Sequence, residues 1–208
     1  FINGRPNDNI GITLFAGESF TQCPLTVDHA VLLDMIHNIK CGLIEDGTAV
    51  GMGIANAVTR LKDSKAKSKV IILLTDGTNN KGDISPMTAA EIAKSFGIRV
   101  YTIGVGTNGM APYPYPVGNT VQYVSMPVEI DEKTLTQIAG TTDGNYFRAT
   151  SNSKLKEVYE EIDKLEKTKL NVKEYSKRDE EYHWFALAAF LCVLLEVLLR
   201  NSILKKIP

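Results

Sequence analysis

Short runs of hydrophobic residues alternate along most of the chain with segments whose hydrophobic residues recur at helical spacing. The clearest run is Val70–Leu74, five apolar residues in a row, which is typical of a strand covered on both faces in a parallel sheet. Further strands are expected over residues 10–15, 19–23, 100–105 and 145–149. Helices are expected over residues 28–39, 49–61, 87–96, 131–139 and 153–165. This alternation predicts an α/β domain with a mostly parallel sheet flanked by helices.

Turn and capping residues set the expected limits of these elements. Residues 19–23 are expected to pair back on residues 10–15 as a hairpin that ends at Pro24. Asp28 or Thr26 can cap the first helix, and Ser153 is expected to cap the last helix of the domain. The stretch 107–127 contains four prolines and is expected to form an irregular loop.

In parallel sheets, ligands bind at the carboxyl ends of the strands, which directs attention to Asp76 and Thr48. Asp76 follows the Val70–Leu74 run, and Thr48 precedes the helix predicted over 49–61. A carboxylate and a hydroxyl are oxygen donors that suit Mg²⁺, which keeps several water ligands. The alternative is that Asp76 lies in an ordinary turn and that Thr48 caps its helix.

A second hydrophobic feature lies near the end of the chain, where residues 184–199 are apolar except for Glu196. With the two residues before it, the stretch would span roughly 27 Å as a helix, close to the ~30 Å hydrocarbon core of a bilayer. We therefore predict a transmembrane helix over residues 182–200, with a buried core helix as the alternative. The basic residues after it predict a cytoplasmic C-terminus and a preceding domain outside the cytoplasm.

The rest of the chain divides around this span. We expect a folded domain over residues 1–167, a charged linker over 168–181 and a cytoplasmic tail over 201–208. The sequence begins at Phe1 without a signal peptide, so we interpret it as the C-terminal part of a longer protein.

Composition and charge narrow the possible functions. The 208 residues carry a net charge of -1 with no basic block, which argues against nucleic acid as a partner. The sequence contains no phosphate-binding G-x-x-x-x-G-K-[ST] motif and no nucleophile elbow, so no catalytic residue is assigned. The segment 104–109 matches G-x-G-x-x-G by letter, but prolines follow where the fingerprint requires a helix.

Two features remain open. Cys23 and Cys41 could form a disulfide in an oxidising compartment, or remain two separate small buried thiols. Three tyrosines alternate with prolines in the 107–127 stretch, which could recognise a partner or form a solvent-exposed insertion.

Several segments resemble the von Willebrand factor A (VWA) family in the same order. Residues 70–77 (VIILLTDG) are similar to its signature strand and 47–51 (GTAVG) to its threonine loop. Residues 99–106 resemble its next strand, and residues 135–139 with Tyr146-Phe147 its closing helix and strand. Cys23, Asp46–Thr48, Met126–Ile130 and the C-terminal apolar stretch resemble the BatA-type membrane proteins of a bacterial aerotolerance operon.

The resemblance implies a Rossmann-like VWA fold with a metal-ion-dependent adhesion site. On this sequence Thr48 and Asp76 match two of its ligands, for Mg²⁺ or another divalent cation. The family's Asp-x-Ser-x-Ser loop has no counterpart here, since it would follow a first strand upstream of Phe1 that lies between strands 10–15 and 70–74. We therefore expect an incomplete metal site that binds Mg²⁺ weakly or not at all.

The function implied by the resemblance is recognition rather than catalysis. A cation held by the domain would bind an acidic side chain of a partner protein. The BatA-type similarity implies a bacterial cytoplasmic (inner) membrane protein with its folded domain on the extracytoplasmic side. It also implies a stress-tolerance complex that works with a MoxR-type AAA+ ATPase. The alternatives are a Mg²⁺-dependent phosphoryl-transfer enzyme and an inert structural membrane spacer.

Overall fold

The computed structural model describes residues 1–40, 42, 44–106, 109–117, 120–128, 130–175 and 182–202. The chain divides into two compact units, Phe1–Lys167 and Thr168–Pro208. The expected tail beyond residue 202, Cys41 and part of the expected linker lie outside the described residues. The fold that positions the candidate site belongs to the first unit.

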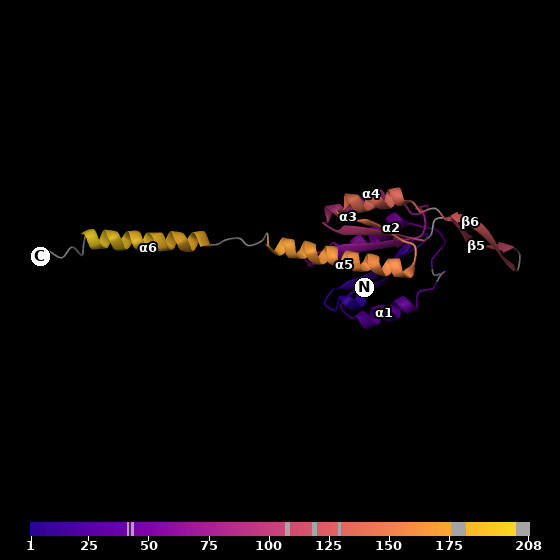
Figure 1. Cartoon of the computed structure of the whole chain (residues 1–208), viewed down its shortest axis with the longest axis horizontal. Helices are drawn as coiled ribbons and strands as arrows, with labels where there is room; N and C mark the ends of the chain where they lie inside the picture. Colours follow the sequence, from indigo (N-terminus) through magenta and orange to yellow (C-terminus); the bar gives the residue numbers. More distant parts are fainter. Residues whose placement is uncertain are drawn as a thin grey trace. The chain divides into compact units, whose positions relative to one another are not determined.

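The described strands form three sheets (Figure 1). A parallel sheet has the order β3-β4-β7, and two antiparallel pairs are β1–β2 and β5–β6. The strands are β1 (Ile10–Phe15), β2 (Ser19–Thr26), β3 (Val70–Thr75), β4 (Arg99–Val105), β5 (Gly109–Val117), β6 (Thr120–Val128) and β7 (Tyr146–Ala149). The predicted α/β class with a parallel sheet is confirmed.

Helices cover both faces of the parallel sheet. The helices of the first unit are α1 (His29–His37), α2 (Val50–Leu61), α3 (Pro86–Ser95), α4 (Glu132–Thr141) and the greater part of α5 (Asn152–Tyr175); a 3₁₀ turn spans Ile2–Gly4. One core cluster joins α2, α3 and α4 to one face, with Ile54, Val100 and Ile138 fully buried. A second cluster packs α5 on the other face, through Val158 and Ile162 against Tyr101 and Ile103.

Several element limits differ from the prediction. β2 continues through Pro24 to Thr26, because β2 pairs only with β1 among the described strands and an edge strand tolerates a proline. Ser151, rather than Ser153, caps α5 by accepting a hydrogen bond from the Lys154 N–H (3.2 Å). The helix also continues past Lys167 to Tyr175, into the segment expected to be a linker.

The largest difference concerns residues 107–127, for which the prolines predict an irregular loop. Residues 109–117 and 120–128 instead form the antiparallel strands β5 and β6, which we call the β5–β6 hairpin. Proline lacks a backbone N–H, but Pro112, Pro114 and Pro116 occupy every second position of β5. In an antiparallel pair, every second residue directs its N–H away from the partner strand. The three prolines all occupy such outward positions of β5, so they remove no hydrogen bond between β5 and β6.

β1 and β3 share no ladder among the described strands, and each of them is hydrogen-bonded on one side only. The resemblance to the VWA family implies that the family's first strand would lie between these two and complete a continuous sheet. That placement stays a prediction.

A buried polar cluster around Glu166 fixes α5 to the sheet. The Glu166 side chain is 4% exposed and accepts hydrogen bonds from the Tyr101 hydroxyl (2.6 Å) and the Ser68 hydroxyl (2.9 Å). It also forms an ion pair with Arg99 at the start of β4. Burial raises the pKa of the Glu166 carboxyl, but these three donors outweigh it and hold the pKa below its usual value. Burial, reinforced by Glu166, also raises the pKa of Tyr101.

We predict that Glu166→Ala lowers the free energy of unfolding by on the order of 3 kcal/mol, because it leaves the Arg99 charge buried without its partner. Urea unfolding followed by circular dichroism measures the change. Glu161→Ala, an exposed position on the same helix, is the matched control and should change stability by less than about 0.5 kcal/mol. Equal losses in the two variants would contradict the assigned role of Glu166.

The same cluster predicts a pH dependence. The pKa of Glu166 is lower in the folded state than in the unfolded chain. The contribution of the Glu166 carboxylate to the free energy of unfolding is therefore complete above the usual glutamate pKa of about 4.3, and it is lost as the pH falls toward the pKa of the folded state. Acid titration should therefore narrow the stability difference between the wild type and Glu166→Gln. A difference that widens on acidification would show that Glu166 does not contribute as a carboxylate.

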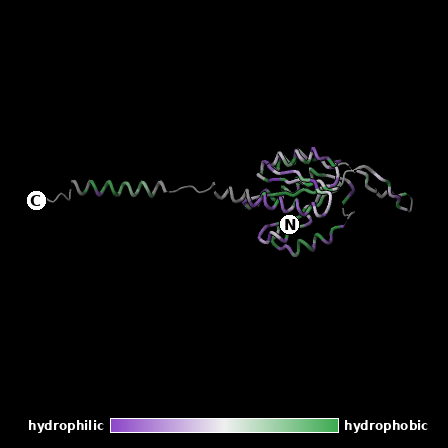
Figure 2. The backbone as a smooth tube through the Cα atoms, in the orientation of Figure 1, coloured by the Kyte–Doolittle hydropathy of each residue, from purple (hydrophilic) through white to green (hydrophobic). Residues whose placement is uncertain are grey.

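In the second unit, hydrophobic residues predominate in α6 (Tyr182–Ser202) (Figure 2). Its large apolar side chains that the structure describes are all exposed, including Phe185 (77%) and Phe190 (63%). Over the described residues, no helix has both the length and the apolar character that a membrane span requires. The predicted span over 182–200 is therefore not confirmed.

Candidate functional site

The two predicted oxygen donors lie on loops that meet at the carboxyl edge of the parallel sheet. β3 ends at Thr75, which is paired with Gly104 of β4, so Asp76 leaves the sheet at its carboxyl edge. The loop that contains Thr48 leads into α2, which packs on the same sheet. The topology thus brings together two segments that lie far apart in the sequence.

The contact between these loops is direct. A Cβ placed on Gly77 would lie 3.1 Å from the Thr48 hydroxyl oxygen, so a larger residue beside Asp76 would crowd this hydroxyl. The α2 helix has no side-chain capping hydrogen bond at its start, where the N-cap is Ala49. The alternative interpretation of Thr48 as a helix cap is therefore wrong.

The backbone of Thr48 is fixed by Asn80, a residue that the sequence analysis did not single out. The Thr48 N–H donates to Asn80 Oδ1 (2.8 Å), and the Asn80 N–H donates back to the Thr48 carbonyl (3.0 Å). The Lys81 N–H donates to the same carbonyl (3.3 Å). These bonds connect the Thr48 loop to the segment after Asp76. The only sign of this role in the sequence is an asparagine shortly after Thr75-Asp76-Gly77, and its partner, Thr48, is distant in the sequence.

The donors suit a hard cation in kind but not in number. Thr48 offers a half-buried hydroxyl and Asp76 an exposed carboxylate, both oxygen ligands of the type that Mg²⁺ prefers. An octahedral cation needs six ligands, so most would have to come from water or other groups. In the described part of the chain, no group of three or more His, Cys, Asp or Glu side chains could hold a metal ion.

Gly51 allows the start of α2 to approach the loop before α3. A Cβ on Gly51 would lie 2.0 Å from the Ile84 carbonyl oxygen, closer than any real contact. The absent side chain thus sets the position of the first turn of α2, and with it the loop that carries Thr48.

We predict that Gly51→Ala lowers the free energy of unfolding by about 1–3 kcal/mol, because the helix must move away from the Ile84 carbonyl. Thermal unfolding by calorimetry measures this change. Gly140→Ala is the matched control, because Gly140 lies in α4 and a Cβ added there would meet no atom within 4 Å. It should be neutral or stabilise by up to about 1 kcal/mol. Destabilisation by both variants alike would contradict the close approach assigned to Gly51.

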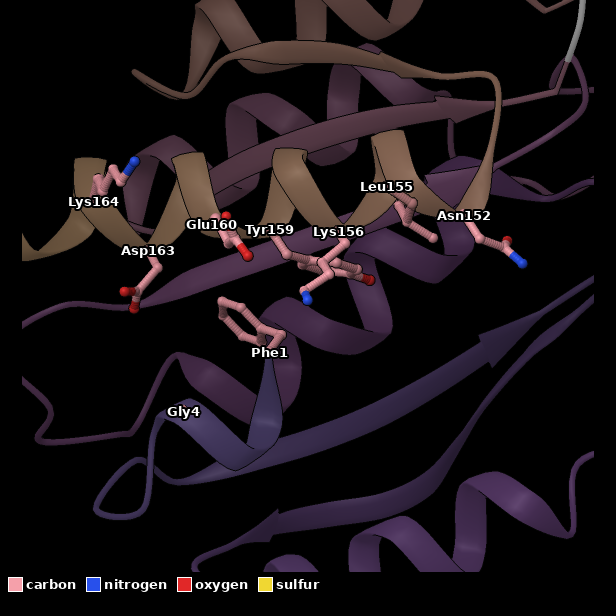
Figure 3. A pocket seen from close by; sticks show the side chains of 9 residues that line it. All are labelled: Phe1, Gly4, Asn152, Leu155, Lys156, Tyr159, Glu160, Asp163 and Lys164. Carbon is pink, nitrogen blue, oxygen red and sulfur yellow. The ribbon is translucent and has the colours of Figure 1, made fainter.

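The other sequence candidates lie apart from this site. The glycine-rich segment 104–109 leads into β5, not into a helix, so it lacks the helix N-terminus that a dinucleotide fingerprint needs. Cys23 is buried as a free thiol, and Cys41 lies outside the described residues. Figure 3 shows a groove between the N-terminal turn and α5, with Phe1 facing Tyr159. Their ring centres are 5.2 Å apart, and neither Thr48 nor Asp76 lines this groove.

The fold is that of an α/β domain in which the loops carrying Thr48 and Asp76 meet at the carboxyl edge of a parallel sheet. The family model of the von Willebrand factor type A domain matches residues 1–161. The chain therefore belongs to the VWA family, in agreement with the resemblance seen in the sequence.

Known relatives agree with this assignment. An aerotolerance-related membrane protein from Bacteroides fragilis is 30% identical, with a TM-score of 0.65 over 78% of this chain and 83% of its own. Proximal thread matrix protein 1 from the mussel byssus, in a structure with a zinc-occupied MIDAS motif, is 26% identical with a TM-score of 0.58, over 79% of this chain and 37% of its own. An uncharacterized protein from Borreliella burgdorferi is 26% identical over this whole chain, which spans 61% of that relative's length.

Proposed function

We propose that this domain recognises a partner protein through a divalent cation held at the edge that Thr48 and Asp76 share. The observation that carries the proposal is the approach of the Thr48 hydroxyl to Gly77, since it brings both oxygen donors to one edge of the sheet. A VWA-domain relative with a zinc-occupied MIDAS motif supports divalent cation binding at this kind of site.

In the proposed mechanism, the cation supplies positive charge that can bind a carboxylate of the partner. Asp76, at the end of β3, would supply a negatively charged carboxylate oxygen to the cation, and the Thr48 hydroxyl would supply a neutral oxygen. The hydrogen bonds from the Asn80 and Lys81 N–H groups to the Thr48 carbonyl hold the loop that would present this hydroxyl. The proposed mechanism includes no proton transfer by a side chain of this site, so the role proposed is binding rather than catalysis.

We predict that the chain binds Mg²⁺ no more tightly than millimolar concentrations, because two side-chain donors leave most of the coordination shell to water. Isothermal titration calorimetry of the full chain measures this affinity. Asp76→Asn should abolish the remaining heat of binding. Asp63→Asn, an exposed aspartate after α2, should not change it. Submicromolar affinity in the wild type would contradict the incomplete coordination shell.

Partner capture is tested in cells that make the protein, by chemical cross-linking and mass spectrometry of the cross-linked partners. Capture that depends on Mg²⁺, is lost with chelator and is lost in Thr48→Ala and Asp76→Ala supports recognition. The controls Thr59→Ala and Asp63→Ala change exposed residues away from the site. Equal capture by all variants would leave the inert-spacer alternative standing, and loss of a phosphoryl-transfer activity would favour the enzyme.

We further propose that α6 attaches the domain to the bacterial cytoplasmic membrane, with the folded domain on the extracytoplasmic side. The exposed apolar side chains of α6 and the description of the Bacteroides fragilis relative as a membrane protein support this attachment. The basic residues after α6 support the orientation. A MoxR-type AAA+ ATPase is proposed as another component of the same stress-tolerance system, not as the ligand of the cation site.

We predict that the full chain remains with bacterial membranes after a carbonate wash, because transfer of α6 into lipid removes its exposed apolar surface from water. Replacing Leu191 and Leu194 together by Asp should move the protein to the soluble fraction, since each charge costs about 2.5–3.5 kcal/mol in a bilayer. Replacing the same leucines by Ile is the control. A wild-type protein that the wash releases would contradict membrane attachment.

A further inference from the structure

The two outer edges of the β5–β6 hairpin differ in their capacity to pair with another strand. The register joins Pro112 to Ser125, Pro114 to Tyr123 and Pro116 to Val121. A proline cannot donate to the ladder, so these are the pairs without mutual hydrogen bonds, and both members direct their backbone groups outward. The outer edge of β5 therefore lacks an N–H donor at each of the three prolines.

Outward on β6, by contrast, Val121, Tyr123 and Ser125 each present an N–H and a carbonyl. β5 and β6 pair with each other and with no other described strand, so this row of groups faces no strand of the described fold. The side chains along the same strand are also exposed, with Val121 at 59% and Tyr123 at 72%. Such an edge is a template for an added strand.

The composition of β6 indicates which strand fits. Residues 120–126 contain no charged residue and no proline, so the strand lacks the devices that usually prevent edge pairing. Two copies therefore meet without repulsion between like charges. An antiparallel pair related by a two-fold axis at Tyr123 would join Val121 of one copy to Ser125 of the other, and Tyr123 to itself. This register overlaps the whole proline-free segment.

We propose that two copies of this chain associate through the β6 edges of their hairpins, forming a four-stranded antiparallel sheet. A two-stranded hairpin by itself is only marginally stable in water, and two added strands would supply the missing support. The interface is self-complementary, as a two-fold dimer requires. It goes beyond the cation site, because neither Thr48 nor Asp76 takes part in it.

The test compares Tyr123→Pro with Tyr123→Thr in the full chain, solubilised in detergent and measured by light scattering after size exclusion. Proline removes the outward N–H but spares the β5 ladder, whereas threonine keeps the N–H and changes only the side chain. The wild type and Tyr123→Thr are expected to dimerise, and Tyr123→Pro to weaken the dimer at least ten-fold. A monomeric wild type, or a dimer that Tyr123→Pro leaves unchanged, would overturn the proposal; the latter would point to association through α6.

The register is tested by cross-linking after the three native cysteines are replaced by alanine. Tyr123→Cys places the two thiols directly opposite each other, and oxidation should give a disulfide-linked dimer. Gln122→Cys is the control, because in this register residue 122 faces residue 124 of the other copy and the two 122 positions are about 7–8 Å apart. Cross-linking of both variants alike would exclude the proposed pairing. Asp76→Asn should dimerise like the wild type, so failure of the cation site and failure of this interface are distinguishable.

Discussion

The parallel pairing of β3 with β4 is the constraint on which the arrangement of the domain depends. It aligns Thr75 with Gly104, so that Asp76 and the segment leading to the β5–β6 hairpin leave the sheet at the same edge. The helices that cover one face then bring the Thr48 loop to that edge through the approach of Gly51 to the Ile84 carbonyl. A sheet pairing shifted by one residue would turn every buried side chain of β3 to the opposite face.

Much of this arrangement follows from local patterns in the sequence. The apolar run at 70–74 identifies a central strand, and the rule that ligands bind at carboxyl ends of strands selects Asp76. The helix predicted over 49–61 begins with the small residues Ala49, Gly51 and Gly53, which allow a helix to lie close to a sheet. These signals are strong because a strand buried on both faces and a closely packed helix each restrict the residue types they accept.

Other features depend on pairings that no local pattern specifies. Prolines in 107–127 predict a loop when each is considered alone, whereas their two-residue spacing is compatible with one strand of a hairpin. Asn80 contributes through a hydrogen bond to a residue far away in the sequence. Glutamate is typical of solvent-facing helix positions, so the sequence gives no sign that Glu166 is buried. Only the fold brings Arg99, Tyr101 and Ser68 to its side chain. In each case the missing information is a long-range contact.

The position of Glu166 also has a mechanical consequence. It lies next to Lys167, the last residue of the first unit. If α6 is held in a membrane, as proposed, tension along the chain would reach the folded domain at this point. The ion pair and hydrogen bonds of Glu166 would carry that load into the first residues of β4, in the sheet interior. A load applied there would enter the sheet at the amino end of β4, whereas Thr48 and Asp76 lie at the carboxyl edge, at the opposite ends of the strands.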